Sequence, residues 1–311
     1  MNITVVGSLN YDLVTTTDII PNGGETVHAN NFETHHGGKG ANTALALARL
    51  SPSTTTVTMV GKVGDDEFGE QLISGLKKVN VNVNHIRKVQ GERTGIAVIL
   101  VESSGENRIL VYPGANANVE SSDIDEALLQ ESNYLILQNE IPVSTTIEVM
   151  ERAAKHPAVK TVYNPSPIKQ LPQNVWELVH ILAVNSSEAA TIAQVSEITT
   201  TEEAYLALDK LLTLGVKEAV VITLGSHGAV FATKNPYNKG FVPTQKVSKV
   251  VDTTGAGDTF LASVVSRLAQ KDSIQSALEF ASKASAIVVT RPGAADSIPT
   301  LEEVLGYNFN T

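Results

Sequence analysis

The chain has 311 residues, of which 42% are hydrophobic and 18% charged, so it can bury a large core. Its net charge of -10 argues against a nucleic-acid partner and against binding to an anionic membrane surface. The absence of cysteine excludes disulfides and thiol catalysis, and the sequence contains neither a signal-peptide pattern nor an apolar run of about 18 residues. We therefore expect a cytosolic protein with no membrane contact.

The chain starts with a short apolar run, residues 3–6, which predicts a buried strand. Asn10 and Asp12 follow its carboxyl end, where ligands bind in open α/β sheets. Both residues are candidates for contact with a polar substrate, although residues of these types also form ordinary turns.

A glycine-rich stretch, HHGGKGANTALALARL at residues 35–50, predicts a helix with an open entrance. Lys39 and Asn42 in this entrance are donors suited to sugar hydroxyls or to a phosphate. The spacing is not that of a Walker A loop, and the dinucleotide fingerprint G-x-G-x-x-G is absent. The adjacent histidines His35 and His36 raise the question of a metal, but we expect them to be solvated loop residues.

Two β-rich segments follow a predicted strand at residues 56–60 and a predicted helix at 66–78. These segments, residues 94–101 and 107–112, are separated by ESSGEN and predict a hairpin with Gly105 in the turn. Together with a polar stretch they predict a small sheet outside the main fold, with strands within about 11–32 and 94–112. This sheet is either a lid over a site or an ordinary hairpin extension.

Short apolar strands alternate with helices from residue 134 onward, which is typical of an α/β fold with a parallel sheet. Strands are predicted at 134–137, 161–163, 181–184 and 219–223, and helices at 144–155 and 202–214. Polar residues follow each of these strands, so four strand ends at one edge predict a single binding crevice. No repeat or linker interrupts the pattern, and we expect one domain spanning residues 1–311.

The run VDTTGAGDTF at residues 251–260 predicts a strand end, a glycine turn and the start of a helix, because apolar residues then recur at helical spacing. The free amides and the dipole of a helix N-terminus can hold a phosphate when glycines leave room for it. Asp258 at the same place is suited to accept the proton of an attacking hydroxyl. The simpler interpretation is a tight turn with an aspartate near the N-cap.

Several motifs together resemble those of the PfkB-like carbohydrate kinases, the family of the ribokinases. They are GSLNYD (7–12), GGET (23–26), GGKGAN (37–42), QNE (138–140), NSSE (185–188), TLGSHG (223–228), DTTGAGDTF (252–260) and TRPGAADSIP (290–299). Two separate glycine signatures in this order are far more specific than either alone. The resemblance spans nearly the whole chain and implies a central, mostly parallel sheet flanked by helices, with a β lid through which ribokinases dimerise.

The resemblance implies ATP-dependent phosphorylation of D-ribose at O5, with Mg²⁺ and the monovalent cation K⁺ as further requirements. The implied catalytic residues are the base Asp258 and the anion-hole turn Gly255, Ala256 and Gly257, in which the amides of residues 256–258 hold the transferring phosphoryl group. The implied sugar-binding residues are Asn10, Asp12, Gly38, Lys39, Asn42, Glu140 and Asp258.

The resemblance also implies contacts to the nucleotide and to metal ions. The nucleotide contacts are Asn185, Thr223, Leu224, Gly225, Ser226, His227, Gly228, Gly257 and Ser282. Glu188 belongs to an N-x-x-E pattern tied indirectly to magnesium. The monovalent-cation set is Asp252, Thr254, Val288, Arg291, Gly293 and Ser297. Without the resemblance, Asp252 would be expected to cap its turn or to pair with Arg291.

The sequence departs from the family pattern at three places. Asn139 stands where an apolar residue is expected, NSSE lacks an additional acid, and Ser282 replaces a larger residue that meets the adenine. A fructokinase-like or nucleoside kinase is the alternative within the family, and the polar sugar-binding set favours a free sugar. A sugar-sensing protein without turnover is the alternative from another class, against which the intact Asp258 argues.

Overall fold

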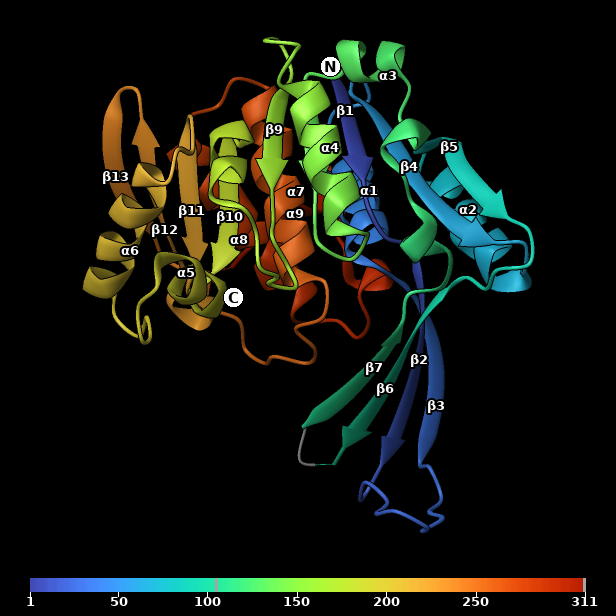
Figure 1. Cartoon of the computed structure of the whole chain (residues 1–311). Coiled ribbons are helices and arrows are strands. Elements are labelled where there is room, and N and C mark those ends of the chain that lie inside the picture. Colours follow the sequence, from blue (N-terminus) through green and yellow to red (C-terminus); the bar gives the residue numbers. More distant parts are fainter. Residues whose placement is uncertain (104–105, 310–311) are drawn as a thin grey trace.

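The main element of the computed structural model, which describes residues 1–103 and 106–309, is a nine-stranded sheet (Figure 1). Its order is β13-β12-β11-β10-β9-β8-β1-β4-β5. The β11–β12 and β12–β13 pairs are antiparallel and the other pairs are parallel. The strands are β1 (Asn2–Val6), β4 (Thr56–Gly64), β5 (Asn82–Val89), β8 (Tyr134–Leu137), β9 (Lys160–Tyr163), β10 (Ile181–Asn185), β11 (Ala219–Thr223), β12 (Ala229–Lys234) and β13 (Tyr237–Val242).

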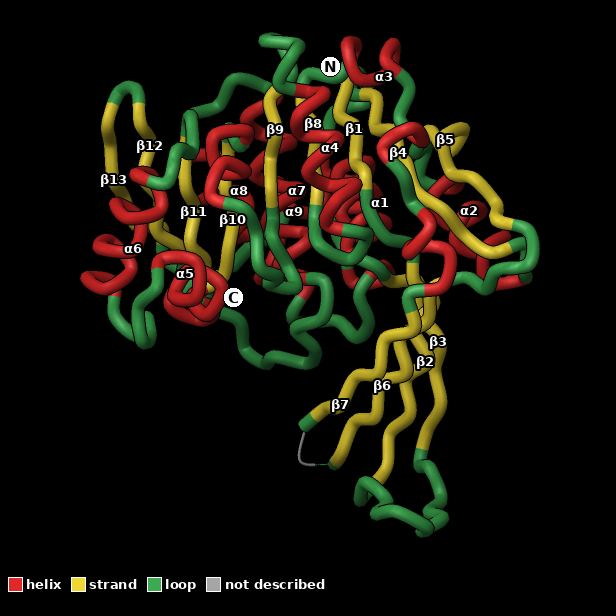
Figure 2. The backbone as a smooth tube through the Cα atoms, in the orientation of Figure 1, coloured by secondary structure: helices red, strands yellow, loops and turns green. Residues whose placement is uncertain are grey.

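Helices cover both faces of this sheet (Figures 1 and 2). One face carries α1 (Lys39–Leu50), α2 (Glu67–Lys78), α7 (Ala256–Ala269), α8 (Ile274–Val288) and α9 (Leu301–Gly306). The other face carries α3 (Glu126–Glu131), α4 (Val143–Ala153), α5 (Ser186–Ala193) and α6 (Thr201–Thr213). None of the helices in the described ranges combines the length and the apolar composition that a membrane span requires.

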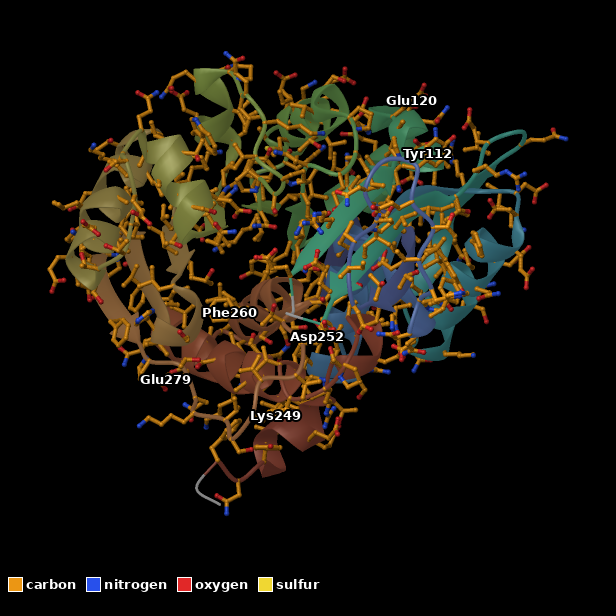
Figure 3. The ribbon with its side chains drawn as sticks, turned by 90° about the horizontal axis from the view of Figure 1, so that it is seen from below. Tyr112, Glu120, Lys249, Asp252, Phe260 and Glu279 are labelled. Carbon is orange, nitrogen blue, oxygen red and sulfur yellow. The ribbon has the colours of Figure 1, made fainter. Side chains whose placement is uncertain are left out.

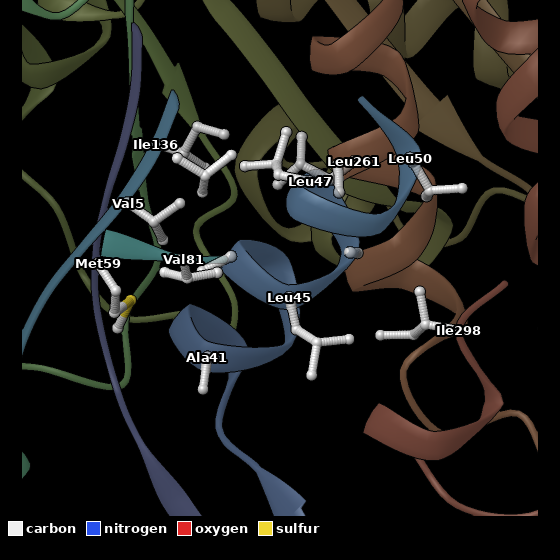
Figure 4. Close-up of a cluster of buried hydrophobic side chains, with 14 of the residues drawn as sticks. Val5, Ala41, Leu45, Leu47, Leu50, Met59, Val81, Ile136, Leu261 and Ile298 are labelled. Carbon is white, nitrogen blue, oxygen red and sulfur yellow. The ribbon is translucent and has the colours of Figure 1, made fainter. Parts of the chain in front are cut away.

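The core beneath α1 shows why this helix is fixed on the sheet (Figure 4). Leu45, Leu47 and Leu50 of α1 are buried in one cluster with strand residues such as Met59 and Ile136. Burying a leucine side chain of this kind is worth about 1.5–3 kcal/mol. The glycine-rich entrance of α1 is therefore anchored by the apolar side chains that follow it.

Helices α1 and α7 lie side by side and run in the same direction. Asn42 near the start of α1 donates to Asp258 near the start of α7, at 3.0 Å. Ser51, which follows the last residue of α1, is hydrogen-bonded to Ser266 near the end of α7, at 2.9 Å. Both glycine-rich helix N-termini, and so the positive ends of both helix dipoles, are brought to the same place.

A four-stranded sheet, with order β3-β2-β6-β7, projects from the edge where the parallel strands end (Figure 1). It consists of β2 (Asn10–Thr17), β3 (Asn31–Gly37), β6 (Gly95–Glu102) and β7 (Asn107–Tyr112). The predicted small sheet is thus present: residues 11–17 of the polar stretch lie in β2, residues 31–32 begin β3, and the segment between the two strands is irregular. Asn10, His35 and His36 lie within strands, so the expectation of loop histidines was wrong. The predicted turn at Gly105 lies outside the described residues.

Candidate active site

The polar residues that were predicted to form a binding site lie mainly at the carboxyl edge of the parallel strands, where the four-stranded sheet also begins (Figure 1). Asn185 at the end of β10 and Thr223 at the end of β11 are paired neighbours in the sheet. Figure 3 views the molecule from this side and shows Asp252, which precedes α7, and Phe260, which lies within α7, near its centre.

Most of the predicted sugar-binding residues form one connected polar group. The Glu140 carboxylate accepts hydrogen bonds from the Lys39 amide at 2.9 Å and from the Ser8 hydroxyl at 2.6 Å. Asn42 donates to the Asp258 carboxylate, and the Lys39 ammonium interacts electrostatically with Asp258 and Glu140. Gly38 begins α1 with a φ of 88°, which an L-residue rarely adopts.

Asn10 is buried and held by Asn116, a residue that the sequence did not single out. The Asn116 side chain accepts from the Leu9 amide at 2.9 Å and donates to the Asn10 side-chain oxygen at 2.7 Å. It lies in a short 3-10 turn, Gly114–Asn118, that follows β7. The only signal for it was a polar residue in a glycine-rich turn after a predicted strand, which does not reveal a partner 106 residues away.

Two buried carboxylates, those of Asp12 and Asp258, the partly buried carboxylate of Glu140 and the Lys39 ammonium set the electrostatics of this group. Burial, together with the carboxylates of Glu140 and Asp258, raises the pKa of Asp12 from 3.8 to about 7. Burial also raises the pKa of Asp258, although the charge of Lys39 and the hydrogen bond from Asn42 each lower it in part. In turn, Asp258 raises the pKa of Lys39 despite the burial of that side chain. An aspartate with a raised pKa is a better proton acceptor for a hydroxyl at neutral pH than an ordinary one.

Replacing Asp12 by asparagine should stabilise the protein more at pH 8 than at pH 5. The pKa rises from 3.8 to about 7 on folding, so the stability that Asp12 contributes is present below pH 3.8 and is lost as the pH passes 7. Asp12→Asn removes this loss. The gain in unfolding free energy of the variant over the wild type should therefore be about 2 kcal/mol larger at pH 8 than at pH 5. Urea unfolding of both proteins at the two pH values measures this difference. A gain in unfolding free energy that is the same at both pH values would contradict the raised pKa of Asp12.

The start of α7 presents backbone amides and little side-chain bulk. Gly255 is the N-cap with a φ of 76°, and Thr259 donates the first intrahelical hydrogen bond, to Gly255, at 2.9 Å. The amides of Gly257 and Asp258 precede that bond, whereas the Ala256 amide donates to the Thr253 carbonyl at 3.2 Å. In this structure two of the three predicted amides are therefore left for an anion.

Most of the predicted nucleotide-contact residues lie at the ends of β10 and β11. Asn185 and Glu188 form a reciprocal cap of α5, in which the Glu188 carboxylate accepts from the Asn185 amide at 3.0 Å. One Glu188 oxygen is thus committed to the helix start, and the other fits a hydrated magnesium ion. The residues after Thr223 form a tight turn closed by a hydrogen bond from the Leu224 amide to the Gly228 carbonyl, at 2.8 Å; the turn contains Leu224, Gly225, Ser226, His227 and Gly228.

Ser282 is buried on α8, and its hydroxyl is occupied by the protein itself. It donates to the Pro243 carbonyl at 3.0 Å and accepts from the Gln245 amide at 3.2 Å. These bonds hold the loop after β13 against α8. Ser282 therefore shapes the position of that loop rather than offering a free hydroxyl to a base.

Asp252 caps the turn before α7 and reaches the segment at residues 290–297. Its carboxylate accepts from the Thr254 amide at 2.9 Å, from the Thr254 hydroxyl at 2.7 Å and from the Gly293 amide at 2.9 Å. Partial burial alone would raise the pKa of Asp252, but these hydrogen bonds outweigh it and leave the pKa below its usual value. An ionised carboxylate beside irregular backbone fits a weakly hydrated cation.

The remaining members of the predicted cation set are engaged in contacts of their own. The Val288 carbonyl accepts from the Arg291 amide at 3.0 Å, and the Arg291 guanidinium pairs with Glu303 at 2.9 Å rather than with Asp252. The buried Ser297 hydroxyl donates to the Ala294 carbonyl at 2.7 Å. The structure thus shows the turn-capping role of Asp252 and gives Arg291 a different partner.

Asn139, the unexpected polar residue of QNE, is explained by Tyr163. The Tyr163 hydroxyl donates to the Asn139 side-chain oxygen at 2.6 Å, and the Asn139 amide group donates to the Pro167 carbonyl at 3.2 Å. Both side chains are fully buried, so each provides the partner that the other requires. The pair ties the end of β8, just before Glu140, to β9.

Known proteins resemble the chain along its whole length. A family model described as pfkB family carbohydrate kinase matches residues 1–301. The chain is 45% identical to a ribokinase of Schizosaccharomyces pombe, covering 100% of this chain and 98% of that protein. It is 36% identical to a ribokinase of Staphylococcus aureus, covering 97% and 98%. The solved structure of Arabidopsis thaliana ribokinase complexed with ribose and ATP has a TM-score of 0.90 at 30% identity, covering 98% and 99%. The chain belongs to the pfkB family of carbohydrate kinases.

Proposed function

We propose that this kinase transfers the γ-phosphoryl group of ATP to O5 of D-ribose, giving D-ribose 5-phosphate and ADP. The observation that carries the proposal is the contact between Asn42 and Asp258, at 3.0 Å. This contact joins the polar residues at the start of α1, which are suited to sugar hydroxyls, to a buried acid at the N-terminus of α7, where backbone amides can bind an anion. The names of the relatives, ribokinases at 36% and 45% identity, support ribose as the acceptor.

The residues of the chain provide most of what this reaction requires. Asp258 accepts the proton of the O5 hydroxyl while the new O–P bond forms and the bond to ADP breaks. The amides of Gly257 and Asp258 hold the transferring phosphoryl group, and Asn42 orients the Asp258 carboxylate. Lys39, Glu140, Asn10 and Asp12 bind the other sugar hydroxyls. Magnesium, when bound, neutralises charge on the phosphates, and Asn185 and Glu188 are placed to orient its water shell.

We also propose that the four-stranded sheet is a lid and a dimer interface within a single domain, residues 1–311. Its outer strand exposes four consecutive apolar residues, Ile109, Leu110, Val111 and Tyr112, and β3 exposes Phe32. Contiguous exposed apolar surface of this kind is typical of protein–protein interfaces. The requirement for ATP supports the cytosolic location that the composition indicated.

ADP release measured with a panel of acceptors tests the proposed function. The panel contains D-ribose, 2-deoxy-D-ribose, D-fructose and adenosine, each with ATP and Mg²⁺. The highest kcat/KM should be that for D-ribose. A higher value for fructose or adenosine would favour the fructokinase-like or nucleoside-kinase alternative, and sugar binding without ADP release would favour a sensing protein.

Potassium should activate the enzyme through Asp252. The motivation is the ionised carboxylate that joins residue 254 to residue 293, directly before the anion hole. Turnover at constant ionic strength should be at least about fivefold higher in potassium than in tetramethylammonium, with sodium between them. Asp252→Ala should abolish the difference, while Asp209→Ala, which removes a carboxylate paired with Lys239 away from this turn, should keep it. Equal rates of the wild type in all three salts would end the idea.

A further inference from the structure

His35 connects the four-stranded sheet to the segment at residues 290–297. It lies on β3 opposite Asp12 of β2 in the antiparallel pair, so the two side chains share one face of the sheet. Its imidazole lies against Gly293, where an added Cβ would be 3.0 Å from Nδ1. Nδ1 is 3.8 Å from the Asp296 carboxylate, Nε2 is 3.2 Å from the Glu33 carboxylate, and only 18% of the side chain is exposed.

The segment that His35 touches is tied at two points to the turn before α7. The Gly293 amide donates to the Asp252 carboxylate at 2.9 Å, and the same carboxylate holds the Thr254 amide at 2.9 Å. Ala294 packs against Gly255, because a Cβ added to Gly255 would lie 3.2 Å from the Ala294 Cα. A displacement of residues 290–297 is therefore transmitted to the residue that caps the anion-binding helix.

The neighbouring histidine, His36, does not have this position. It lies near the ring of Tyr11, with 6.0 Å between ring centroids, and an added Cβ on Gly75 of α2 would collide with it. Successive residues of a strand point to opposite faces of the sheet. Of the two adjacent histidines, His35 lies directly against Gly293, while His36 packs towards α2 and meets the segment at a small cavity that Ala295 also lines.

We propose that His35 is a positioning residue that couples sugar binding at Asp12 to the conformation of residues 290–297 and of the anion hole. The proposal rests on the proposed function, because it takes D-ribose as the ligand beside Asp12. When the sugar fixes β2, the hydrogen-bonded ladder fixes β3, and His35 then holds Gly293 in place. The phosphate-binding turn is completed only when an acceptor is present, which limits transfer of the phosphoryl group to water.

Hydrogen exchange of residues 290–297, measured by mass spectrometry with and without saturating D-ribose, tests the coupling without any turnover. Titration calorimetry establishes in each protein that ribose binds. Ribose should slow exchange of this segment at least about fivefold in the wild type. In His35→Ala the effect should fall below about twofold although ribose still binds, and His36→Ala should behave like the wild type.

The outcomes separate the two proposals. Ribose binding without an effect on residues 290–297 in the wild type, or an equal effect in His35→Ala, would overturn the coupling and leave the proposed function intact. No heat with ribose in the wild type would remove the proposed function and the coupling with it. If His35→Ala does not fold, His35→Gln provides the same comparison, because it keeps a polar side chain but removes the ring that covers Gly293.

Discussion

Asp258→Asn should lower turnover by about 10² to 10⁴ while ribose binding changes little. The substitution keeps the shape of the side chain and an oxygen that accepts from Asn42, but it removes the group that takes the proton. Because burial raises the pKa of Asp258, ionising it in the folded protein is costly, and the variant should be at least as stable as the wild type at neutral pH. Loss of activity and retained stability should therefore occur together.

The measurements are steady-state kcat, calorimetry with ribose and thermal unfolding. Asp123→Asn is a matched control, since Asp123 is also a buried aspartate but pairs with Lys62 at 2.9 Å and Arg87 at 3.2 Å. That variant should lose stability and keep its turnover per folded molecule. Near-normal turnover in Asp258→Asn would remove Asp258 as the base.

Gly257→Val should lower kcat by about 10² or more with little loss of stability. An added Cβ at Gly257 meets no protein atom within 4 Å, so the methyl groups would occupy the open space in front of the amides. The φ of Gly257 is not in the positive range, so its backbone conformation is open to residues with a side chain.

Gly255→Ala should show the opposite effect on stability, which Gly257→Val leaves nearly unchanged. Gly255 has a φ of 76° and its added Cβ would lie 3.2 Å from the Ala294 Cα, so this variant should lose at least about 1 kcal/mol of stability. Gly306→Val, at another position with open space, controls for the larger side chain itself. If Gly257→Val is unfolded, the turn is structural; if it is fully active, the amides do not hold the phosphate.

The parts of the fold that the sequence predicted are those with a strong apolar pattern. The strands at 134–137 and 219–223 were placed residue for residue, and α1 and α7 were predicted from apolar side chains at helical spacing. Strands β2 and β3 fall partly in the stretch 11–32 from which strands of the small sheet were predicted, but their bounds were not predicted, because polar residues dominate both strands, as expected for a sheet that projects into solvent. Strands β12 and β13 were not predicted at all.

The site was predictable only where a motif is local. The glycine entrances and Asp258 stand in short runs, and the structure brings them together through helix packing. Asn116 was missed because its role depends on two residues 106 and 107 positions away, and such partners follow from topology rather than from spacing. The histidine pair shows the same limit, since only the register of β2 with β3 tells the two rings apart.

The parallel packing of α1 against α7 has a consequence for engineering the enzyme. In the proposed reaction α1 carries Lys39 and Asn42 and α7 carries Asp258 and the anion-binding amides, and two hydrogen bonds at opposite ends fix the alignment of the two helices. A library that seeks new acceptors should therefore keep the contact surface of both helices constant and vary the strand ends instead. Changes at Ser51 or Ser266 would misalign the acceptor hydroxyl for every sugar alike.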